Sequence, residues 1–190
     1  MQSFLQDIDE CVKNLRLGNL ILYPTDTVWG IGCDATNEKA IEKIYKLKKR
    51  SDEKAMIVLV TDEKEITKHV MYVDPSLFTY LKRSSKPTTV VYDNASGFPQ
   101  NLIAKDGSIA IRICKDDFCD GLIKKFGKPI VSTSANISGM PSPKVFDQIN
   151  DEIKRGVDYV VQYRQNDTTA AEPSSIIRWD LNGTVTVLRS

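Results

Sequence analysis

The sequence contains little from which a metal site, a disulfide framework or a membrane span can be built. It has one histidine, His69, and its four cysteines, at positions 11, 33, 114 and 119, form no CxxC pair. No apolar run approaches the roughly 20 residues that a membrane-spanning helix needs. We therefore expect a cytoplasmic protein with reduced thiols, no metal site made by its own side chains and no membrane association.

The net charge is also small. The 26 basic and 25 acidic residues leave a formal charge of +1, so no global field draws the protein to nucleic acid or to an anionic membrane. Any such binding has to be local. The 190 residues, 41% of them hydrophobic, suffice for one well-buried core, and we expect one domain over residues 1–190.

The order of the apolar segments is typical of an α/β fold. An amphipathic helix at residues 4–15, ended by Gly18, precedes a buried strand at residues 20–23. Further strands are expected at residues 55–60, 88–92, 108–113 and 129–131, with helices at 37–49 and 117–126 and weaker helical signals at 62–83. Asn182-Gly183 predicts a C-terminal hairpin. These elements predict an α/β fold with one twisted, open, mostly parallel or mixed sheet and flanking helices.

The most informative segment is the polar octet at residues 132–139 (STSANISG), which directly follows the apolar run at 129–131. A buried strand that gives way to hydroxyls, an amide and a glycine places hydrogen-bonding groups where open α/β sheets bind their ligands. Residues 25–32 (TDTVWGIG) follow the strand at 20–23 in the same way. The alternative for the octet is a loop whose side chains bond only their own backbone.

Two cations are aimed at the protein interior. Lys48 falls on the apolar stripe of the helix at 37–49, so that it and Arg50 can deliver positive charge to a phosphate or carboxylate. A lysine that snorkels near a helix end is the alternative. Arg112 interrupts an apolar strand and has to meet an anion, which is either a structural carboxylate or part of a ligand.

Neither a common nucleotide-binding motif nor a nucleophile is evident. The glycines follow no GxGxxG or Walker spacing. His69 lies outside the polar segments, so we expect no Ser-His-Asp triad. Hydroxyls, an amide and cations without an obvious base indicate a site that binds and aligns an anionic substrate and catalyses by positioning and electrostatics.

Four segments resemble, in order, the motifs of the YrdC-like family. They are Pro24-Thr25-Asp26-Thr27-Val28-Trp29-Gly30 for PTxT(Y/W)G, Lys48-Lys49-Arg50 for KxR, Ser134-Ala135-Asn136 with Ser138-Gly139 for SxN, and Pro173-Ser174-Ser175 for a PST-like motif. The resemblance covers about residues 20–189 and implies the short, single-domain form of the YrdC-like fold. It implies threonylcarbamoyl-AMP synthase activity, in which L-threonine, bicarbonate and ATP with Mg²⁺ give threonylcarbamoyl-AMP and pyrophosphate. A downstream tRNA threonylcarbamoyl transferase would then use the product to modify tRNA.

The resemblance also implies a role for each residue of the motifs. L-threonine would be held by Thr27, Arg112, Ser132 and either Ser174 or Ser175. ATP would be held by Lys48, Arg50, Ser108, Ser134, Asn136, Ser142 and Arg189. Catalysis would fall to Lys48, Arg50, Ser134 and Asn136, with a magnesium ion helping the cations to offset charge on the phosphates.

The sequence departs from the family pattern in three places. Residues 84–89 (SSKPTT) stand where many members carry WPGPxT. Leu59 stands where some members have a histidine that contacts threonine, and Lys54 where some have an asparagine for ATP. We therefore expect the far side of threonine to be held differently here.

Two alternatives remain. One is a non-catalytic module that binds double-stranded RNA or tRNA through a basic strip. The strip would comprise Lys43, Lys46, Lys49, Arg50, Lys54, Lys82, Arg83 and Lys86. The other is carbamoyl transfer through carbamoyl-adenylate, the activity of YrdC-like domains within larger hydrogenase-maturation proteins.

Overall fold

A nine-stranded mixed sheet forms the centre of the computed structural model, which describes residues 4–49, 56–180 and 183–190. Its strand order within these residues is β7-β1-β2-β6-β3-β5-β4-β8-β9. The strands are β1 (Ile21–Tyr23), β2 (Gly30–Asp34), β3 (Ile57–Val60), β4 (Thr88–Tyr92), β5 (Ile109–Ile113), β6 (Ile130–Ser134), β7 (Tyr159–Val160), β8 (Ser175–Trp179) and β9 (Val185–Arg189).

The predicted open, mixed sheet is confirmed, and its antiparallel pairs predominate. Among the described strands, β1–β7, β3–β5 and β4–β8 are parallel, whereas the other five neighbouring pairs are antiparallel. Much of the antiparallel character comes from β2, which pairs with both β1 and β6 and was not expected as a strand. Its two glycines and its position directly after a polar loop conceal the strand pattern in the sequence.

The helices are α1 (Leu5–Arg16), α2 (Glu38–Leu47), α3 (Glu63–His69), α4 (Pro75–Arg83), α5 (Asp117–Phe126) and α6 (Asp151–Gly156). The predicted α2 and α5 are confirmed, and each begins at a residue that caps it. The side chain of Asn37 accepts a hydrogen bond from the Ala40 amide, and Asp116 accepts one from the Cys119 amide. Gly127 ends α5 in the left-handed conformation, with φ of 80°.

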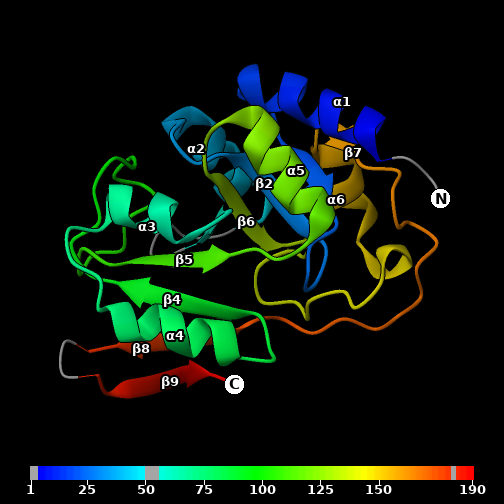
Figure 1. Cartoon of the computed structure of the whole chain (residues 1–190). Coiled ribbons are helices and arrows are strands. Elements are labelled where there is room, and N and C mark those ends of the chain that lie inside the picture. The colour runs from blue at the N-terminus through cyan, green and yellow to red at the C-terminus, as the bar shows by residue number, and fades with distance from the viewer. Residues whose placement is uncertain (1–3, 50–55, 181–182) are drawn as a thin grey trace.

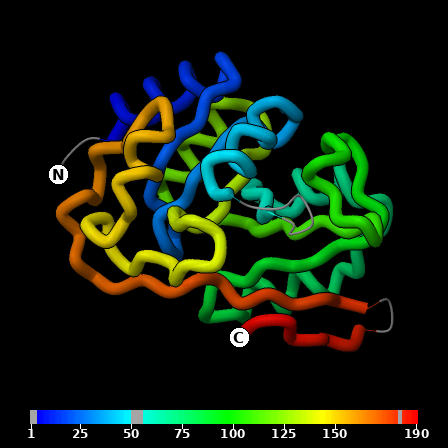
Figure 2. Tube along the Cα trace, turned by 180° about the vertical axis from the view of Figure 1, so that it is seen from behind, coloured from blue at the N-terminus to red at the C-terminus, as the bar shows by residue number. Residues whose placement is uncertain are grey.

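The helices leave one part of the sheet uncovered. In Figure 1, α1, α5, α3 and α4 lie on the viewer's side of the sheet, and Figure 2 shows α2 on the opposite side. On that opposite side, no helix of the described residues lies over β5, β4 and β8 in Figure 2. No helix among the described residues is long and apolar enough to cross a membrane.

Residues of three of the four motifs line one pocket of the sheet. The loop at residues 24–29 connects β1 to β2, and residues 135–139 follow β6, which lies beside β2. Pro173 and Ser174 immediately precede β8. The fold therefore brings segments that are far apart in the sequence to one region of the sheet.

Candidate active site

A pocket of about 220 Å³ brings together most of the residues that the sequence singled out. Of the predicted site residues, its lining includes Thr27, Arg112, Ser132, Ser134, Ser142, Ser174 and Arg189. The remainder of the wall is mainly apolar, with Trp29, Met56, Ile57 and Ile176 among its members. A small pocket with an apolar wall and several convergent polar groups is the usual form of a ligand site.

Arg112 supplies the most deeply buried charge of this pocket. Arg112 is 2% exposed, and its Nη1 lies 2.9 Å from Oδ1 of Asp26. The same nitrogen donates to Oγ1 of Thr27 at 3.1 Å, and Thr25 and Thr27 share a hydrogen bond of 2.9 Å. The buried Nε of Arg112 has no hydrogen-bond partner among the described residues. The guanidinium is thus held by its structural carboxylate and keeps a donor that a ligand can use.

Ser132 faces the pocket because of a glycine on the neighbouring strand. A Cβ atom at Gly30 would lie 2.8 Å from Oγ of Ser132. The register pairs Gly32 with Ser132 and Gly30 with Ser134, so both serines of β6 lie opposite glycines. The absence of a side chain at Gly30 leaves room for the Ser132 hydroxyl within the pocket.

Ser174 and Arg189 form the opposite wall. Oγ of Ser174 lies 2.8 Å from Oγ1 of the buried Thr89, and the Arg189 guanidinium donates to the Ser174 carbonyl through Nε at 3.0 Å and Nη2 at 2.8 Å. Burial, together with the positive charge of Arg112, lowers the pKa of Arg189 below its ordinary value. Two arginines in one pocket create a favourable place for an anion.

Lys48 lies beneath the loop that follows β6. It is 1% exposed, and its Nζ donates hydrogen bonds to the carbonyls of Ser134 and Asn136, the latter at 2.6 Å. The prediction that Lys48 points into the protein is confirmed, and the snorkelling alternative is wrong. The lysine of the KxR motif thus binds the backbone of the SxN motif and fixes its position.

The SxN loop is also held by its own side chains. Ser134 Oγ donates to Oδ1 of Asn136 at 2.5 Å, and Asn136 Nδ2 donates to the carbonyls of Ile137 and Met140 at 2.9 and 2.7 Å. Part of the octet therefore does bond its own backbone, as the alternative for this segment predicted. The Asn136 amide holds the loop, while Ser134 faces the pocket.

The structure does not bring all the expected residues to the pocket lining. Ser108 donates to Asp106 at 2.6 Å before β5, and Ser175 lines a separate surface cavity beyond Ser174. Lys48 and Asn136 support the pocket without lining it. Arg50 and Lys54 lie outside the described residues.

Three residues that our sequence analysis did not assign to the site prove important. Asp26 orients Arg112, Thr89 bonds Ser174, and Gly30 makes space for Ser132. Asp26 had a signal in the sequence, because it stands between two threonines of a polar segment. Gly30 and Thr89 also stand in segments compared with family motifs, but their partners could not be predicted, because these depend on which strands are neighbours. Within the described residues, no three His, Cys, Asp or Glu side chains are grouped so that they can hold a metal ion.

Comparison with known proteins agrees with this geometry. The model of the Sua5/YciO/YrdC family, described as "Telomere recombination", matches residues 13–190. The chain belongs to this family. It is 34% identical over 167 residues to a putative threonylcarbamoyl-AMP synthase of Methanocaldococcus jannaschii, covering 87% of this chain and 77% of the relative. It is 31% identical over 155 residues to the threonylcarbamoyl-AMP synthase of Photobacterium profundum, covering 78% of this chain and 82% of the relative.

Solved structures of the family share the fold. P. abyssi Sua5 complexed with L-threonine superposes with a TM-score of 0.83 at 23% identity, covering 97% of this chain and 54% of that one. E. coli YciO superposes with the same TM-score and identity, and the match covers 97% of this chain and 89% of that one. The YrdC-like fold expected from the sequence is therefore confirmed.

Proposed function

We propose that this chain is a threonylcarbamoyl-AMP synthase, which makes threonylcarbamoyl-AMP and pyrophosphate from L-threonine, bicarbonate and ATP. One observation carries the proposal: hydroxyl-bearing residues of motifs that lie more than a hundred residues apart in the sequence line a single pocket, together with Arg112 and Arg189. The family membership and the names of the two relatives support it. We further propose that residues 1–190 act as one domain.

Threonine binds at the Arg112 end of the pocket in this proposal. The buried Nε of Arg112 is a donor for the threonine carboxylate, and an unsatisfied buried donor costs about 1–3 kcal/mol until it is paired. Thr27 and Ser132 offer hydroxyls beside Arg112, and Ser174 closes the pocket from the opposite wall. Ser175 lies outside this lining, so Ser174 takes the role that the sequence left open between the two.

ATP binds at the end formed by the loop after β6. Ser134 and Ser142 line the pocket near this loop, Arg189 lines it beside Ser174, and all three donate to phosphate oxygens. Lys48 and Asn136 act through the loop, because their bonds hold the backbone at Ser134. Arg50 and Ser108 remain predicted ATP contacts from the family resemblance. Magnesium enters with ATP, bound to its phosphates, and offsets their charge.

The reaction then needs two bond-forming steps. The threonine amine attacks the carbon of bicarbonate, which forms a carbamate with loss of water. A carbamate oxygen attacks the α-phosphorus of ATP, the bond between that phosphorus and the bridging oxygen breaks, and pyrophosphate leaves. The pocket positions the two substrates and stabilises the negative charge that develops on the phosphates.

The product is a mixed anhydride that a second enzyme has to consume. We propose that a tRNA threonylcarbamoyl transferase takes it and transfers the threonylcarbamoyl group to tRNA. Because ATP and tRNA are found there, we propose that this chain acts in the cytoplasm.

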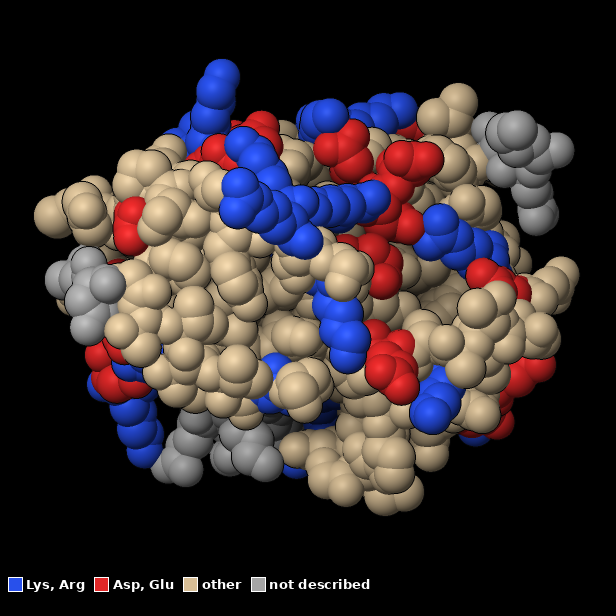
Figure 3. Space-filling view, turned by 60° about the horizontal axis from the view of Figure 1, so that its bottom comes forward, with Lys and Arg blue, Asp and Glu red and all other residues tan. Residues whose placement is uncertain are grey.

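The RNA-binding alternative is not favoured, because several lysines of the expected basic strip are engaged within the protein. Lys49 lies 2.8 Å from Glu152, Lys82 lies 2.9 Å from Glu63, and Lys43 donates to the Gly18 carbonyl at 2.7 Å. On the face shown in Figure 3, Lys and Arg side chains are interspersed with Asp and Glu. That face therefore has no single-sign stripe of the kind that binds nucleic acid.

Pyrophosphate release tests the proposal. The chain is incubated with ATP and magnesium, and L-threonine and bicarbonate are each added or withheld. Release that requires both supports the synthase. Release with carbamoyl phosphate in place of L-threonine and bicarbonate would instead indicate carbamoyl transfer. Release when L-threonine and bicarbonate are both withheld would contradict the proposal.

A further inference from the structure

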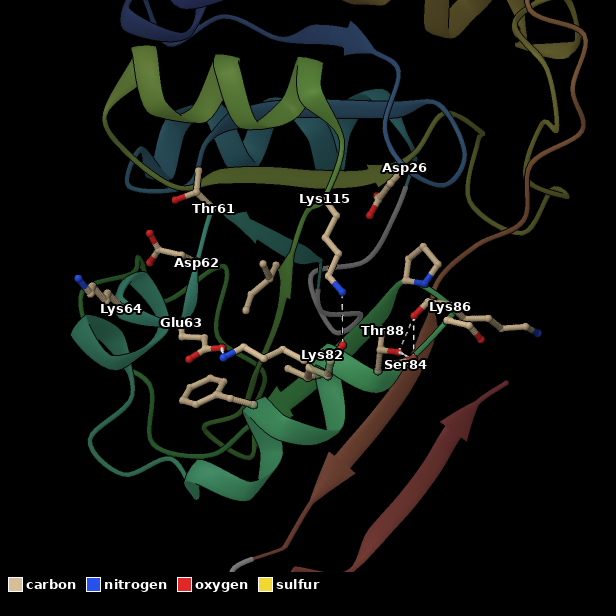
Figure 4. A pocket seen from close by; sticks show the side chains of 15 residues that line it. Asp26, Thr61, Asp62, Glu63, Lys64, Lys82, Ser84, Lys86, Thr88 and Lys115 are labelled. Atoms are coloured by element: carbon tan, nitrogen blue, oxygen red, sulfur yellow. Dashed lines mark hydrogen bonds and ion pairs between the residues drawn. The ribbon is translucent and has the colours of Figure 1, made fainter.

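A second and larger cavity lies on the other side of the sheet. Its volume is about 560 Å³, within the range of small-molecule sites. It is bounded by the first turn of α3, by α4, by residues 84–88 and by the segment that follows β5. Figure 4 shows Thr61, Asp62 and Glu63 on one side of this cleft, with Lys115 and Asp26 on another.

Strand geometry separates the cleft from the candidate active site. Successive strand residues point to opposite faces of a sheet. Arg112 lines the active-site pocket, whereas Ile113 lines the cleft. Asp26 stands between them: its carboxylate pairs with Arg112 and also lines the cleft. The two cavities are therefore distinct neighbours, connected by the ion pair between Asp26 and Arg112.

Apolar side chains form much of the cleft wall. Phe78 and Leu81 come from α4, Ile113 comes from β5, and all three are only partly buried where they pack against the core. Pro87 adds a fourth apolar group. Apolar surface that stays accessible in a concave site favours a ligand with an apolar body, at about 25 cal/mol for each Å² that becomes buried.

The charges of the cleft leave an excess of cations. Its three carboxylates are engaged within the protein: Asp26 with Arg112, Glu63 with Lys82 at 2.9 Å, and Asp62 with the Glu65 amide at 3.0 Å. By contrast, no carboxylate among the described residues pairs with Lys115. Its Nζ donates to the Leu81 carbonyl at 3.4 Å, and Figure 4 shows this side chain extending across the cleft. Lys64 and Lys86 lie at opposite ends of the cleft in that view.

We propose that this cleft binds a small organic anion whose apolar body contacts Phe78, Leu81 and Ile113 and whose carboxylate or phosphate pairs with Lys115. Lys115 exchanges a long hydrogen bond to a carbonyl for a charge-assisted bond to the ligand. The proposal does not depend on the synthase reaction, because none of these groups lines the active-site pocket.

The test uses 8-anilinonaphthalene-1-sulfonate, which combines an aromatic body with an anionic group and fluoresces when it enters an apolar site. We expect saturable binding of one dye molecule per chain. Lys115→Ala should weaken it about tenfold or more, the loss expected for a charge-assisted bond. The matched control is Lys124→Ala, which removes an exposed lysine that pairs with Asp120 on α5 and should change binding less than about twofold. Thr61→Trp, which places a bulky side chain in the cleft, should also reduce binding.

Competition locates the dye and distinguishes the anionic groups. Octanoate and phenyl phosphate are added separately. If either anion displaces the dye from the unaltered chain but not from Lys115→Ala, the result supports the site and shows whether it prefers a carboxylate or a phosphate. Saturating ATP with L-threonine should leave the dye bound. The proposal is overturned if these substrates displace the dye, if neither anion does, or if folded Lys115→Ala binds the dye as tightly as the unaltered chain.

Discussion

Oδ1 of Asp26 lies 2.9 Å from Nη1 of Arg112, and this ion pair connects the loop after β1 with the centre of the sheet. Arg112 is buried, so its charge is tolerated only because Asp26 and Thr27 accept from it. The pair therefore both stabilises the fold and fixes the cation that we assign to the threonine carboxylate.

Replacing Asp26 should affect threonine more than ATP. We expect Asp26→Asn to raise the KM for L-threonine about tenfold or more and to lower the free energy of unfolding by about 3 kcal/mol, because it leaves a buried charge unpaired. Initial rates at varied threonine and urea unfolding measure the two effects. In the control Asp120→Asn, an exposed pair with Lys124 is lost, and stability should change by about 0.5 kcal/mol or less. An unchanged KM for threonine in Asp26→Asn would contradict the assignment.

Two adjacent serines distinguish the pocket from its surroundings. Ser174 lines the pocket and bonds Thr89 at 2.8 Å, whereas Ser175 lies outside it. We expect Ser174→Ala to lower kcat/KM for threonine about tenfold or more, since it removes a pocket hydroxyl and leaves buried Thr89 with one partner fewer. Ser175→Ala should change kcat/KM for threonine by less than about twofold, because Ser175 does not line the pocket. Equal effects of the two substitutions would argue against this wall of the site.

The two glycines of β2 provide another matched pair. A Cβ at Gly30 would meet the Ser132 hydroxyl at 2.8 Å, and one at Gly32 would meet the Tyr23 ring at 2.6 Å and the Val131 carbonyl at 2.9 Å. Because a serine side chain can rotate away, Gly30→Ala should reduce activity with little loss of stability. Gly32→Ala presses on a buried ring and on backbone, so it should lower stability by about 1–3 kcal/mol. Activity assays and urea unfolding of both variants test this; the reverse pattern would contradict the placement of Ser132.

Lys48 should behave as a structural support of the SxN loop. In Lys48→Met the buried carbonyls of Ser134 and Asn136 lose their donor, and we expect a loss of about 2–5 kcal/mol in unfolding free energy together with a loss of activity. Lys49→Met removes only an exposed pair with Glu152 and should cost about 1 kcal/mol or less. Urea midpoints measure both. A Lys48→Met variant as stable as the unaltered chain would show that the ammonium does not hold this loop.

Stability should fall in alkali. Burial is the main cause that raises the pKa of the Cys11, Cys33 and Cys119 thiols above its ordinary value of about 8.5. Below that pH, both states keep these protons; above it, the unfolded chain loses them while the folded chain retains them. The free energy of unfolding should then decrease by about 1.4 kcal/mol per pH unit for each thiol.

Urea unfolding at pH 7.5, 9 and 10 tests this pH dependence. In Cys33→Ala the free energy of unfolding should fall less steeply with pH, by the contribution of one thiol. Stability that is constant up to pH 10 would show that the thiols are accessible to water in the folded chain.

The sequence predicted the polar site better than the architecture around it. The stripe that carries Lys48, the lone charge of Arg112 in an apolar strand and the hydroxyls after β1 and β6 follow from local spacing, and the structure brings them close together. Asp26 as the partner of Arg112 did not follow, because the pairing depends on the position of β5 relative to a loop 85 residues earlier. The family resemblance assigned Asn136 to ATP, which stays a prediction; the structure adds that its amide bonds three groups within four residues of it.

The measurement that tests the central claim most directly is mass spectrometry of the nucleotide product formed with ¹³C-labelled bicarbonate. The chain is incubated with ATP, magnesium and L-threonine, with labelled and unlabelled bicarbonate in parallel. The account predicts threonylcarbamoyl-AMP whose mass increases by the one labelled carbon, and none from a folded Arg112→Gln variant. A folded and unaltered chain that forms no labelled adenylate with all three substrates present would contradict the account.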